Sequence, residues 1–323
     1  MRNNATSFRR AAFLRNIAGV LFLALGFAAT PGRAIVFYST GDPAFNTTAP
    51  TGALTGSGWQ FEGYWAGSLA TAIASNFFIT AQHVGGSVGG TFTLNGTSYT
   101  TTAVYDDPGS DLAIWKVSTV FPAWAPIYTA SDTAGSPLVV FGSGDNRGAD
   151  VSMAGQLKGW QWSGAQAERW GENIVAGTIN YNGSTLLYAN FDAGAGVNEA
   201  TLALGDSGGG VFIRQNSVWS LAGVNFAVDG PFNTTNSGAG FFAAIFDQGG
   251  LYYTNDVTKT WDYITPQTNN IPSSFYATSI SARQDWVQSI IVPEPSAAAL
   301  TGLGLVVFLA TARRRAKRTT RSL

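Results

Sequence analysis

Ser207 lies in a glycine-rich stretch whose composition is suited to acyl-transfer chemistry. The stretch reads Gly205-Asp206-Ser207-Gly208-Gly209-Gly210. Glycine loses the most backbone entropy on ordering, so glycines on both sides of one hydroxyl favour a tight turn over a helix or a strand. Such a turn can direct backbone N–H groups at one point, which is the arrangement of an oxyanion hole. A serine nucleophile also needs a general base and an acid that orients the base.

His83 is the single histidine among the 323 residues, so it is the one imidazole available as a general base. An imidazole can accept the proton of a serine hydroxyl and return it to a leaving group near neutral pH. Asp111 opens the apolar run 111–117, which predicts a buried strand that begins with an acid. Asp106 and Asp107, in the loop just before it, are alternative candidates for the orienting acid.

Each of these features also has an ordinary structural interpretation. A histidine after a strand is commonly a polar residue with satisfied hydrogen bonds, and a glycine-rich loop can simply close a hairpin. The three features occur together in the order His83, Asp111, Ser207, and this combination favours the catalytic interpretation.

The composition predicts an all-β fold without disulfide bonds. The chain has 39 glycines, 13% aromatic residues and no cysteine, which excludes a disulfide framework and thiolate chemistry. Short apolar runs recur between turn residues, and Asn95-Gly96 at the centre of one such run predicts a hairpin. Apolar residues at helical spacing predict a short helix at about 281–291. We find no metal-ligand cluster or phosphate loop in the sequence and expect no metal and no cofactor.

The charge distribution argues against a nucleic acid partner. Eleven of the 18 Lys and Arg residues lie in 1–34 or 313–323, which leaves 7 elsewhere, whereas 18 of the 19 acidic residues lie within 35–292. The formal charge of residues 35–292 is therefore about −11, the wrong sign for binding a phosphate backbone.

Residues 1–34 have the features of a secretory signal peptide. Arg9, Arg10 and Arg15 precede the apolar run 17–29, and small residues follow up to Ala34. This order predicts cleavage after Ala34, with Ala28 as a second possible site. An uncleaved N-terminal anchor is the alternative interpretation, although the apolar run is short for a membrane span.

Residues 292–323 carry a second targeting pattern. Pro293-Glu294-Pro295 is followed by an apolar stretch, 296–312, and by a basic tail that starts at Arg313. These three elements resemble the PEP-CTERM sorting signal of Gram-negative bacteria. The resemblance implies export, a transmembrane helix through 296–312 and an exosortase-type sorting enzyme as a partner.

A plain membrane anchor is the alternative interpretation of the C-terminal pattern. In both interpretations the basic tail stays in the cytoplasm, because positively charged flanks face inward. Residues 35–291 are then expected at the periplasmic face of the inner membrane, and afterwards at the cell surface or outside the cell.

The catalytic motifs resemble those of a known enzyme family. Thr80-Ala81-Gln82-His83, Asp111-Leu112-Ala113-Ile114 and 205–209 are similar to the Thr-Ala-Ala-His, Asp-Ile-Ala-Leu and Gly-Asp-Ser-Gly-Gly motifs of trypsin/chymotrypsin-like serine peptidases. The resemblance covers about 35–291. It implies two antiparallel Greek-key β-barrels, at about 35–125 and 126–280, followed by the helix at about 281–291. It also implies a serine endopeptidase that acts on a polypeptide substrate.

The resemblance assigns a role to each motif residue. Ser207 would be the nucleophile, His83 the general base and Asp111 the residue that orients the imidazole. The N–H groups of Gly205 and Ser207 would form the oxyanion hole. The sequence departs from the family in three places. Val84 stands where a cysteine usually follows the histidine, the interval of 28 residues from His83 to Asp111 is short, and the specificity pocket departs most.

The residues that align with the specificity pocket predict an apolar preference. Thr201 and Leu202 align with its base, and Phe226-Ala227-Val228 aligns with one wall. No acid stands at the base to bind Arg or Lys, and Val228 narrows the space. We therefore expect a small or medium apolar residue on the amino side of the scissile bond.

Signal cleavage after Ala34 would expose Ile35-Val36 as a new N-terminus. In much of the family such an amino group pairs with the acid before the nucleophile, here Asp206, and orders the oxyanion turn. Two other functions stay open at this stage. One is a catalytically silent surface protein that uses the trypsin fold to bind exopolysaccharide, and the other is an esterase with the same mechanism.

Overall fold

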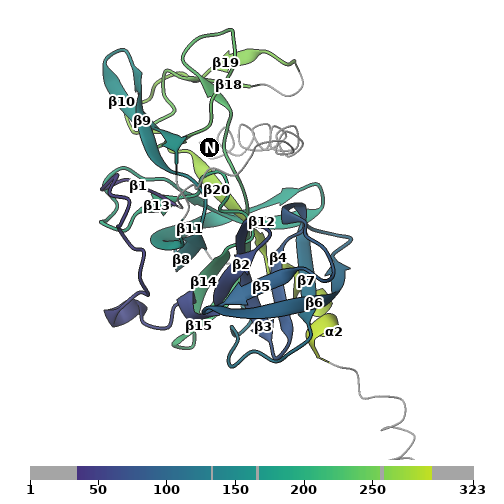
Figure 1. Ribbon diagram of the computed structural model, residues 1–323. Coiled ribbons are helices and arrows are strands. Elements are labelled where there is room, and N and C mark those ends of the chain that lie inside the picture. The colour runs from purple at the N-terminus through teal and green to yellow at the C-terminus, as the bar shows by residue number, and fades with distance from the viewer. Residues whose placement is uncertain (1–34, 132–133, 165–166, 255–257, 293–323) are drawn as a thin grey trace, which may run out of the picture. The chain divides into compact units, whose positions relative to one another are not determined.

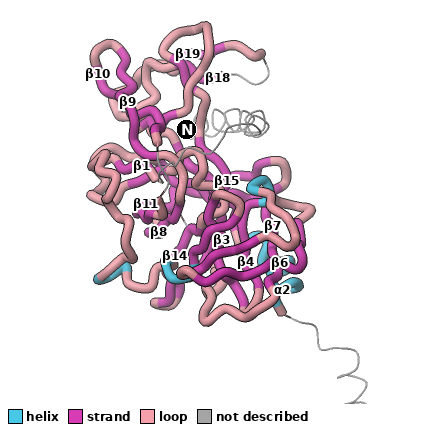
Figure 2. Tube along the Cα trace, viewed as in Figure 1, coloured by secondary structure: helices cyan, strands magenta, loops and turns pink. Residues whose placement is uncertain are grey.

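The computed structural model describes residues 35–131, 134–164, 167–254 and 258–292. The predicted signal peptide and the predicted sorting signal with its membrane span at 296–312 lie outside these ranges. Within them, no helix has the length and apolar character needed to cross a membrane. Almost all regular structure in the described ranges is β (Figure 2).

Six strands form the first barrel (Figure 1). They close in the order β2-β3-β4-β7-β6-β5, so the fourth strand lies beside the first, which is a Greek-key arrangement. The strands are β2 (Glu62–Trp65), β3 (Ser68–Ala74), β4 (Phe77–Ala81), β5 (Thr91–Leu94), β6 (Thr97–Asp106) and β7 (Leu112–Val117).

A second closed barrel repeats this arrangement. Its order is β11-β12-β20-β15-β14-β8, in which the fourth strand, β14, again lies beside the first, β8. The prediction of two antiparallel Greek-key barrels is therefore confirmed. The strands are β8 (Pro137–Gly142), β11 (Arg169–Tyr181), β12 (Ser184–Asn190), β14 (Gly210–Gln215), β15 (Val218–Val228) and β20 (Ser274–Ser279).

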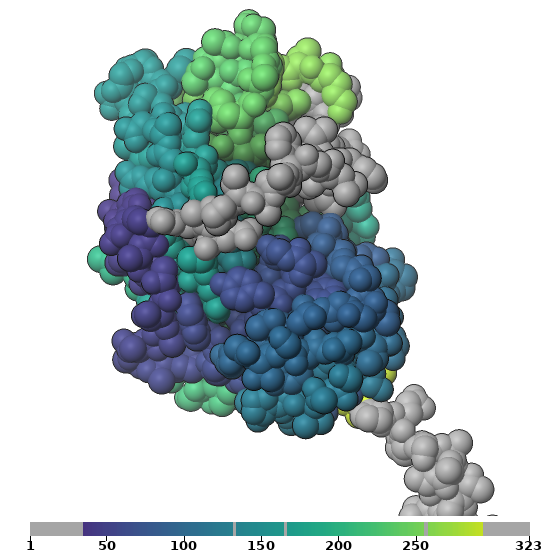
Figure 3. All heavy atoms as spheres, viewed as in Figure 1, coloured from purple at the N-terminus to yellow at the C-terminus, as the bar shows by residue number. Residues whose placement is uncertain are grey.

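Short strands inserted into the second barrel form two further sheets, and one more inserted strand pairs with a strand from the N-terminal segment. The first sheet joins β9 (Asn146–Met153), β10 (Gln156–Ser163) and β17 (Ala243–Ile245). The second joins β16 (Phe232–Asn233), β18 (Tyr252–Thr254) and β19 (Trp261–Tyr263). In the space-filling view the first barrel is the compact blue region, and the teal and green residues of the insertions gather at the other end (Figure 3).

Tight turns close several of the hairpins. The predicted turn at Asn95-Gly96 joins β5 to β6, and both residues have positive φ, 49° and 75°. Two positive φ values in a two-residue loop match the right-handed twist of the flanking strands, and asparagine and glycine tolerate them best. Local sequence therefore sets the register of this hairpin.

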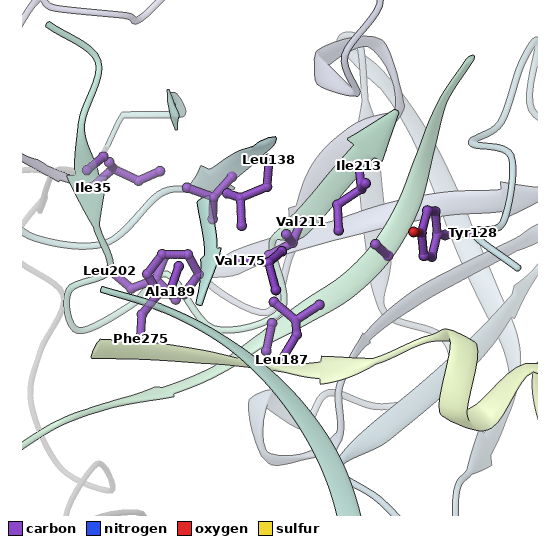
Figure 4. Close-up of a cluster of buried hydrophobic side chains, with 14 of the residues drawn as sticks. Ile35, Tyr128, Leu138, Val175, Leu187, Ala189, Leu202, Val211, Ile213 and Phe275 are labelled. Atoms are coloured by element: carbon purple, nitrogen blue, oxygen red, sulfur yellow. The ribbon is translucent and has the colours of Figure 1, made fainter. Parts of the chain in front are cut away.

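The N-terminal segment joins the second barrel. β1 (Val36–Phe37) pairs with β13 (Ala200–Thr201), just before the nucleophile stretch. Ile35 and Phe37 are fully buried in the aliphatic core of the second barrel, in which Figure 4 shows Ile35 and Leu202. The first barrel predicted at 35–125 includes Ile35 and Phe37, whereas the structure packs these two residues in the core of the second barrel.

The remaining described elements are four 3₁₀ turns and the helix α2 (Gln284–Ile291). The turns are η2 (Gly52–Leu54), η3 (Trp59–Phe61), η4 (Gln82–Val84) and η5 (Ser281–Arg283). The turn η5 and α2 together confirm the short C-terminal helix expected at about 281–291. The chain divides into two units after Gln284, so the boundary falls within α2.

Candidate active site

The register between β4 and β7 brings His83 beside Asp111. These strands are antiparallel neighbours in the first barrel, with Ala81 opposite Leu112. The residues just after Ala81 therefore lie alongside those just before Leu112. The Gln82 N–H donates to the Asp111 carbonyl at 2.9 Å, and the turn η4 then presents His83. Strand pairing thus brings His83 and Asp111 together in space although they are 28 residues apart in sequence.

The three predicted triad side chains form one hydrogen-bonded line. His83 Nδ1 lies 2.5 Å from Asp111 Oδ2, and His83 Nε2 lies 2.7 Å from Ser207 Oγ. The backbone N–H of His83 also donates to Asp111 Oδ1 at 3.0 Å, so both carboxylate oxygens are engaged. The side chains of His83 and Asp111 are 13% and 18% exposed, which leaves the pair largely shielded from water.

The alternative acids lie elsewhere. Asp106 is exposed at the end of β6. Asp107 is buried and forms an ion pair with Arg283. Of the three candidate carboxylates, the one that meets the imidazole is Asp111.

The nucleophile turn needs glycine at Gly208. Its φ is 82°, and a Cβ there would stand 2.5 Å from the Leu69 carbonyl oxygen of the first barrel. The Gly208 N–H donates to the Asn225 carbonyl at 3.0 Å, which ties the turn to β15. In the described part of the chain, the N–H groups of Gly205 and Ser207 donate to no protein group, so both are available to a ligand.

Asp206 holds the turn from inside the second barrel. The carboxylate is buried and accepts three backbone N–H groups: Gly144 and Ala203, both at 2.7 Å, and Ile35 at 3.2 Å. Burial raises the pKa of Asp206 to about 7, although these hydrogen bonds act in the opposite direction. Ile35 and Asp206, whose pairing is predicted after signal cleavage, are therefore in direct contact through the Ile35 N–H.

Glu62 reaches the same turn from the first barrel. Its Oε2 accepts the Gly210 N–H at 3.3 Å, and its Oε1 accepts the Thr71 hydroxyl at 2.7 Å. Burial raises the pKa of Glu62 to about 7. Burial and the nearby Glu62 carboxyl raise the pKa of Glu168 to about 8. Glu62 therefore links the first barrel, by a hydrogen bond, to β14, the strand that follows the nucleophile.

The residues predicted to form the specificity pocket are spread over the second barrel. Phe226 lies at the site, because its ring centroid is 6.1 Å from that of His83. Ala227 packs with it against a small apolar cluster. Thr201 is buried in β13, Leu202 belongs to the aliphatic core, and Val228 packs against that core. The pocket and its apolar preference stay a prediction.

Three residues that position the turn carried no signal in the sequence. Gly144, Asn225 and Glu62 bond to it from distant segments. Asn225 Nδ2 donates to the carbonyl groups of Asp206, at 2.9 Å, and Phe141, at 2.7 Å. Among the described residues, no group of three or more His, Asp or Glu side chains is arranged to hold a metal ion.

Comparisons with known proteins add a distant structural likeness. No protein-family profile matches the sequence, and no curated protein matches it. A solved structure similar to this chain is the passenger domain of plasmid-encoded toxin, an autotransporter enterotoxin from enteroaggregative Escherichia coli. The TM-score is 0.43 and the sequence identity 15%, over 74% of this chain and 22% of the toxin chain.

Proposed function

We propose that this protein is a serine hydrolase that cleaves peptide bonds through Ser207, His83 and Asp111. The observation that carries the proposal is the continuous line from Asp111 Oδ2 through both imidazole nitrogens to Ser207 Oγ, with contacts of 2.5 and 2.7 Å. The 2.7 Å between Ser207 Oγ and His83 Nε2 is within the range that proton transfer between a nucleophile and its base requires, and the shorter contact joins that base to its orienting acid.

The proposed reaction has two halves. Ser207 Oγ attacks the substrate carbonyl carbon while His83 Nε2 accepts its proton, and Asp111 stabilises the imidazolium through Nδ1–H. His83 then donates that proton to the leaving amine as the carbon–nitrogen bond breaks, which leaves an acyl group on Ser207. Water, deprotonated by His83, attacks the acyl carbon, and the serine leaves with the proton.

The unpartnered N–H groups of Gly205 and Ser207 are proposed as the oxyanion donors. An oxygen that becomes negative during attack needs donors that are already oriented and bonded to nothing else. The hydrogen bonds from Gly144 and Asn225 to Asp206 support the turn and help to orient the two N–H groups.

Peptide and ester substrates share this mechanism, so the catalytic residues do not decide between them. The preference for peptides is proposed from the residues at the predicted specificity pocket. Thr201 and Val228 offer no negative charge, and we propose a small or medium apolar residue before the scissile bond. Cleavage of a peptide library would test this preference, and efficient cleavage after Arg would contradict it. Hydrolysis of an ester but not of the matching amide would identify an esterase.

We also propose that signal cleavage completes the site. The Ile35 N–H already contacts Asp206 Oδ2 at 3.2 Å, and a free ammonium there would supply the positive charge that this buried carboxylate lacks. Mass spectrometry of the exported protein would identify its N-terminus. A mature chain that begins at Ile35 should be at least about tenfold more active than one that keeps Ala34, and equal activity would contradict this step.

A fluorophosphonate probe tests the central proposal. The probe reacts with an activated serine, so we expect rapid labelling of the wild-type chain and none of Ser207→Ala or His83→Ala. The Ser131→Ala variant is the matched control, since it changes another serine. A folded wild-type protein that stays unlabelled would instead indicate a catalytically silent protein, and exopolysaccharide binding would then be the function to measure.

A further inference from the structure

Asp107 and Arg283 form an ion pair that joins the loop before Asp111 to the end of the second barrel. Arg283 Nε donates to Asp107 Oδ2 at 2.5 Å, and Nη2 donates to Oδ1. Burial opposes ionisation of Asp107, but hydrogen bonds from Arg283, Ser110 and Gly109 outweigh it and lower the pKa of the carboxyl. A bidentate contact of this kind fixes direction as well as distance.

On the first-barrel side, Asp107 organises the loop that carries Asp111. Its carboxylate accepts the Gly109 N–H at 3.0 Å and the Ser110 hydroxyl at 2.5 Å. Its own N–H donates to the Leu112 carbonyl at 2.9 Å, so the loop closes around the intervening residues. The guanidinium packs on Gly109, where a Cβ would meet it at 2.9 Å.

On the second-barrel side, Arg283 is anchored to the strand that holds the nucleophile turn. Its N–H donates to the Ile280 carbonyl at 3.0 Å, and the Ile280 N–H donates to Ala222 in β15 at 2.9 Å. Three residues further along β15, the Asn225 carbonyl accepts the Gly208 N–H of the nucleophile turn. The acid loop and the nucleophile turn are therefore both attached to β15.

We propose that Asp107 and Arg283 are positioning residues that set the Asp111–His83 unit against Ser207. The inference rests on the proposed function of Ser207. Without the ion pair, the acid loop keeps its hydrogen bonds within the first barrel but loses this connection to the second. A misplacement of reacting groups by about 1 Å can cost about 100-fold in rate.

The test compares Arg283→Ala with the full-length wild-type chain. We expect kcat to fall by about 10- to 100-fold while KM changes by less than about twofold, because ground-state binding is retained. Millimolar guanidinium should restore part of the lost activity by occupying the vacated position. Arg283→Lys keeps the charge but not the fork, and should lie between the two.

Lys158→Ala is the matched control. It removes another ion pair of 2.5 Å, from Lys158 to Asp247, within the second barrel's insertions. We expect it to lower Tm with an unchanged kcat. If Arg283→Ala and Lys158→Ala lower Tm and kcat alike, the Arg283 pair has only a structural role and the inference is wrong. If Arg283→Ala does not fold, Arg283→Lys takes its place in the same comparison.

The single histidine allows a readout that needs no activity. The ring of His83 gives the one imidazole signal set of the chain in ¹H–¹⁵N spectra, and its Nδ1–H reports the bond to Asp111. The inference predicts that this proton signal is displaced or lost in Arg283→Ala and kept in Lys158→Ala. An unchanged signal would overturn it. If the wild-type protein does not react with the fluorophosphonate, the proposed function fails while this spectrum still decides the positioning role.

Discussion

The first barrel closes its six strands within residues 62–117. The second also has six strands but takes residues 137–279, because three insertions lie between its strands. Their cores also differ. Trp65, Phe78, Phe92 and Trp115 make the first core largely aromatic, with the rings of Phe78 and Phe92 stacked 4.2 Å apart. The second core is mainly aliphatic and includes residues from outside the barrel.

The two barrels support their catalytic residues in different ways. His83 and Asp111 are fixed by neighbouring strands of the first barrel and by the bond between them. Ser207 instead follows a turn whose support includes Ile35, buried in the second core and bonded to Asp206. We infer that the base and acid depend on strand pairing in the first barrel and on the Arg283 contact from the end of the second, whereas the nucleophile turn depends also on the N-terminal segment.

Replacing the nucleophile or the base gives the largest expected effect. Ser207→Ala and His83→Ala should each lower kcat by about a million-fold, because the two side chains act as one unit across the barrel junction. The double variant should be no worse than either single variant. Additive losses, measured with an apolar peptide substrate, would show that the residues of the two barrels act separately.

Asp111→Asn removes the charge of the first barrel's acid while keeping its shape. We expect a loss of about ten-thousand-fold in kcat, because an amide can hold the imidazole in the wrong tautomer. Asp106→Asn, on the exposed end of β6, is the control and should retain wild-type kcat. A similar loss in both variants would refute the assignment of Asp111.

Gly144→Ala perturbs the second barrel's support of the oxyanion turn. A Cβ there would stand 2.2 Å from the Leu204 carbonyl oxygen and 2.7 Å from the Asp206 nitrogen. Because both contacts are with backbone, the turn must move, and we expect kcat to fall by about 100-fold, as for loss of one oxyanion donor. Gly41→Ala meets only the flexible Arg147 side chain, at 3.6 Å, and should be neutral. Equal kcat values in the two variants would contradict the role of the turn.

The buried carboxyls predict a smaller effect, on the pH dependence of stability. The pKa of Glu62 is about 7 in the folded chain, above its usual 4.5, so the folded state retains a proton that the unfolded state releases. The free energy of unfolding should therefore fall as pH rises from about 4.5 through about 7. Urea unfolding at both pH values should show a weaker fall in Glu62→Gln than in wild type, and an unchanged fall would contradict the assignment.

Asp206, in the second barrel, should contribute to the same pH dependence of stability as Glu62 in the first. Its pKa, raised to about 7, adds to the fall in stability with pH when Ile35 offers only a peptide N–H. A free ammonium at Ile35 would favour the charged carboxylate and remove this contribution, while leaving that of Glu62. The chain that begins at Ile35 should therefore lose less stability on going to neutral pH than the chain that keeps Ala34.

Local features of the fold could be predicted because their causes lie within a few residues. The hairpin at Asn95-Gly96 follows from backbone preferences at two positions, and the helix near 284–291 from apolar spacing. The motifs around His83 and Ser207 identified the chemistry, since the chain has a single histidine and Ser207 stands in the stretch Gly205-Asp206-Ser207-Gly208-Gly209-Gly210. The sequence alone determined these residue types and these turns.

The tertiary structure decided which distant residues meet. The pairing of β4 with β7 places Asp111 beside the imidazole and leaves Asp106 and Asp107 elsewhere. Residue type alone left the three acids open, and the motif at 111–114 favoured Asp111 by resemblance only. Packing between the two barrels brings Glu62 to Gly210 across 148 residues and Arg283 to Asp107 across 176. These contacts depend on strand register and burial over the whole domain, and for that physical reason a reading of local motifs does not contain them.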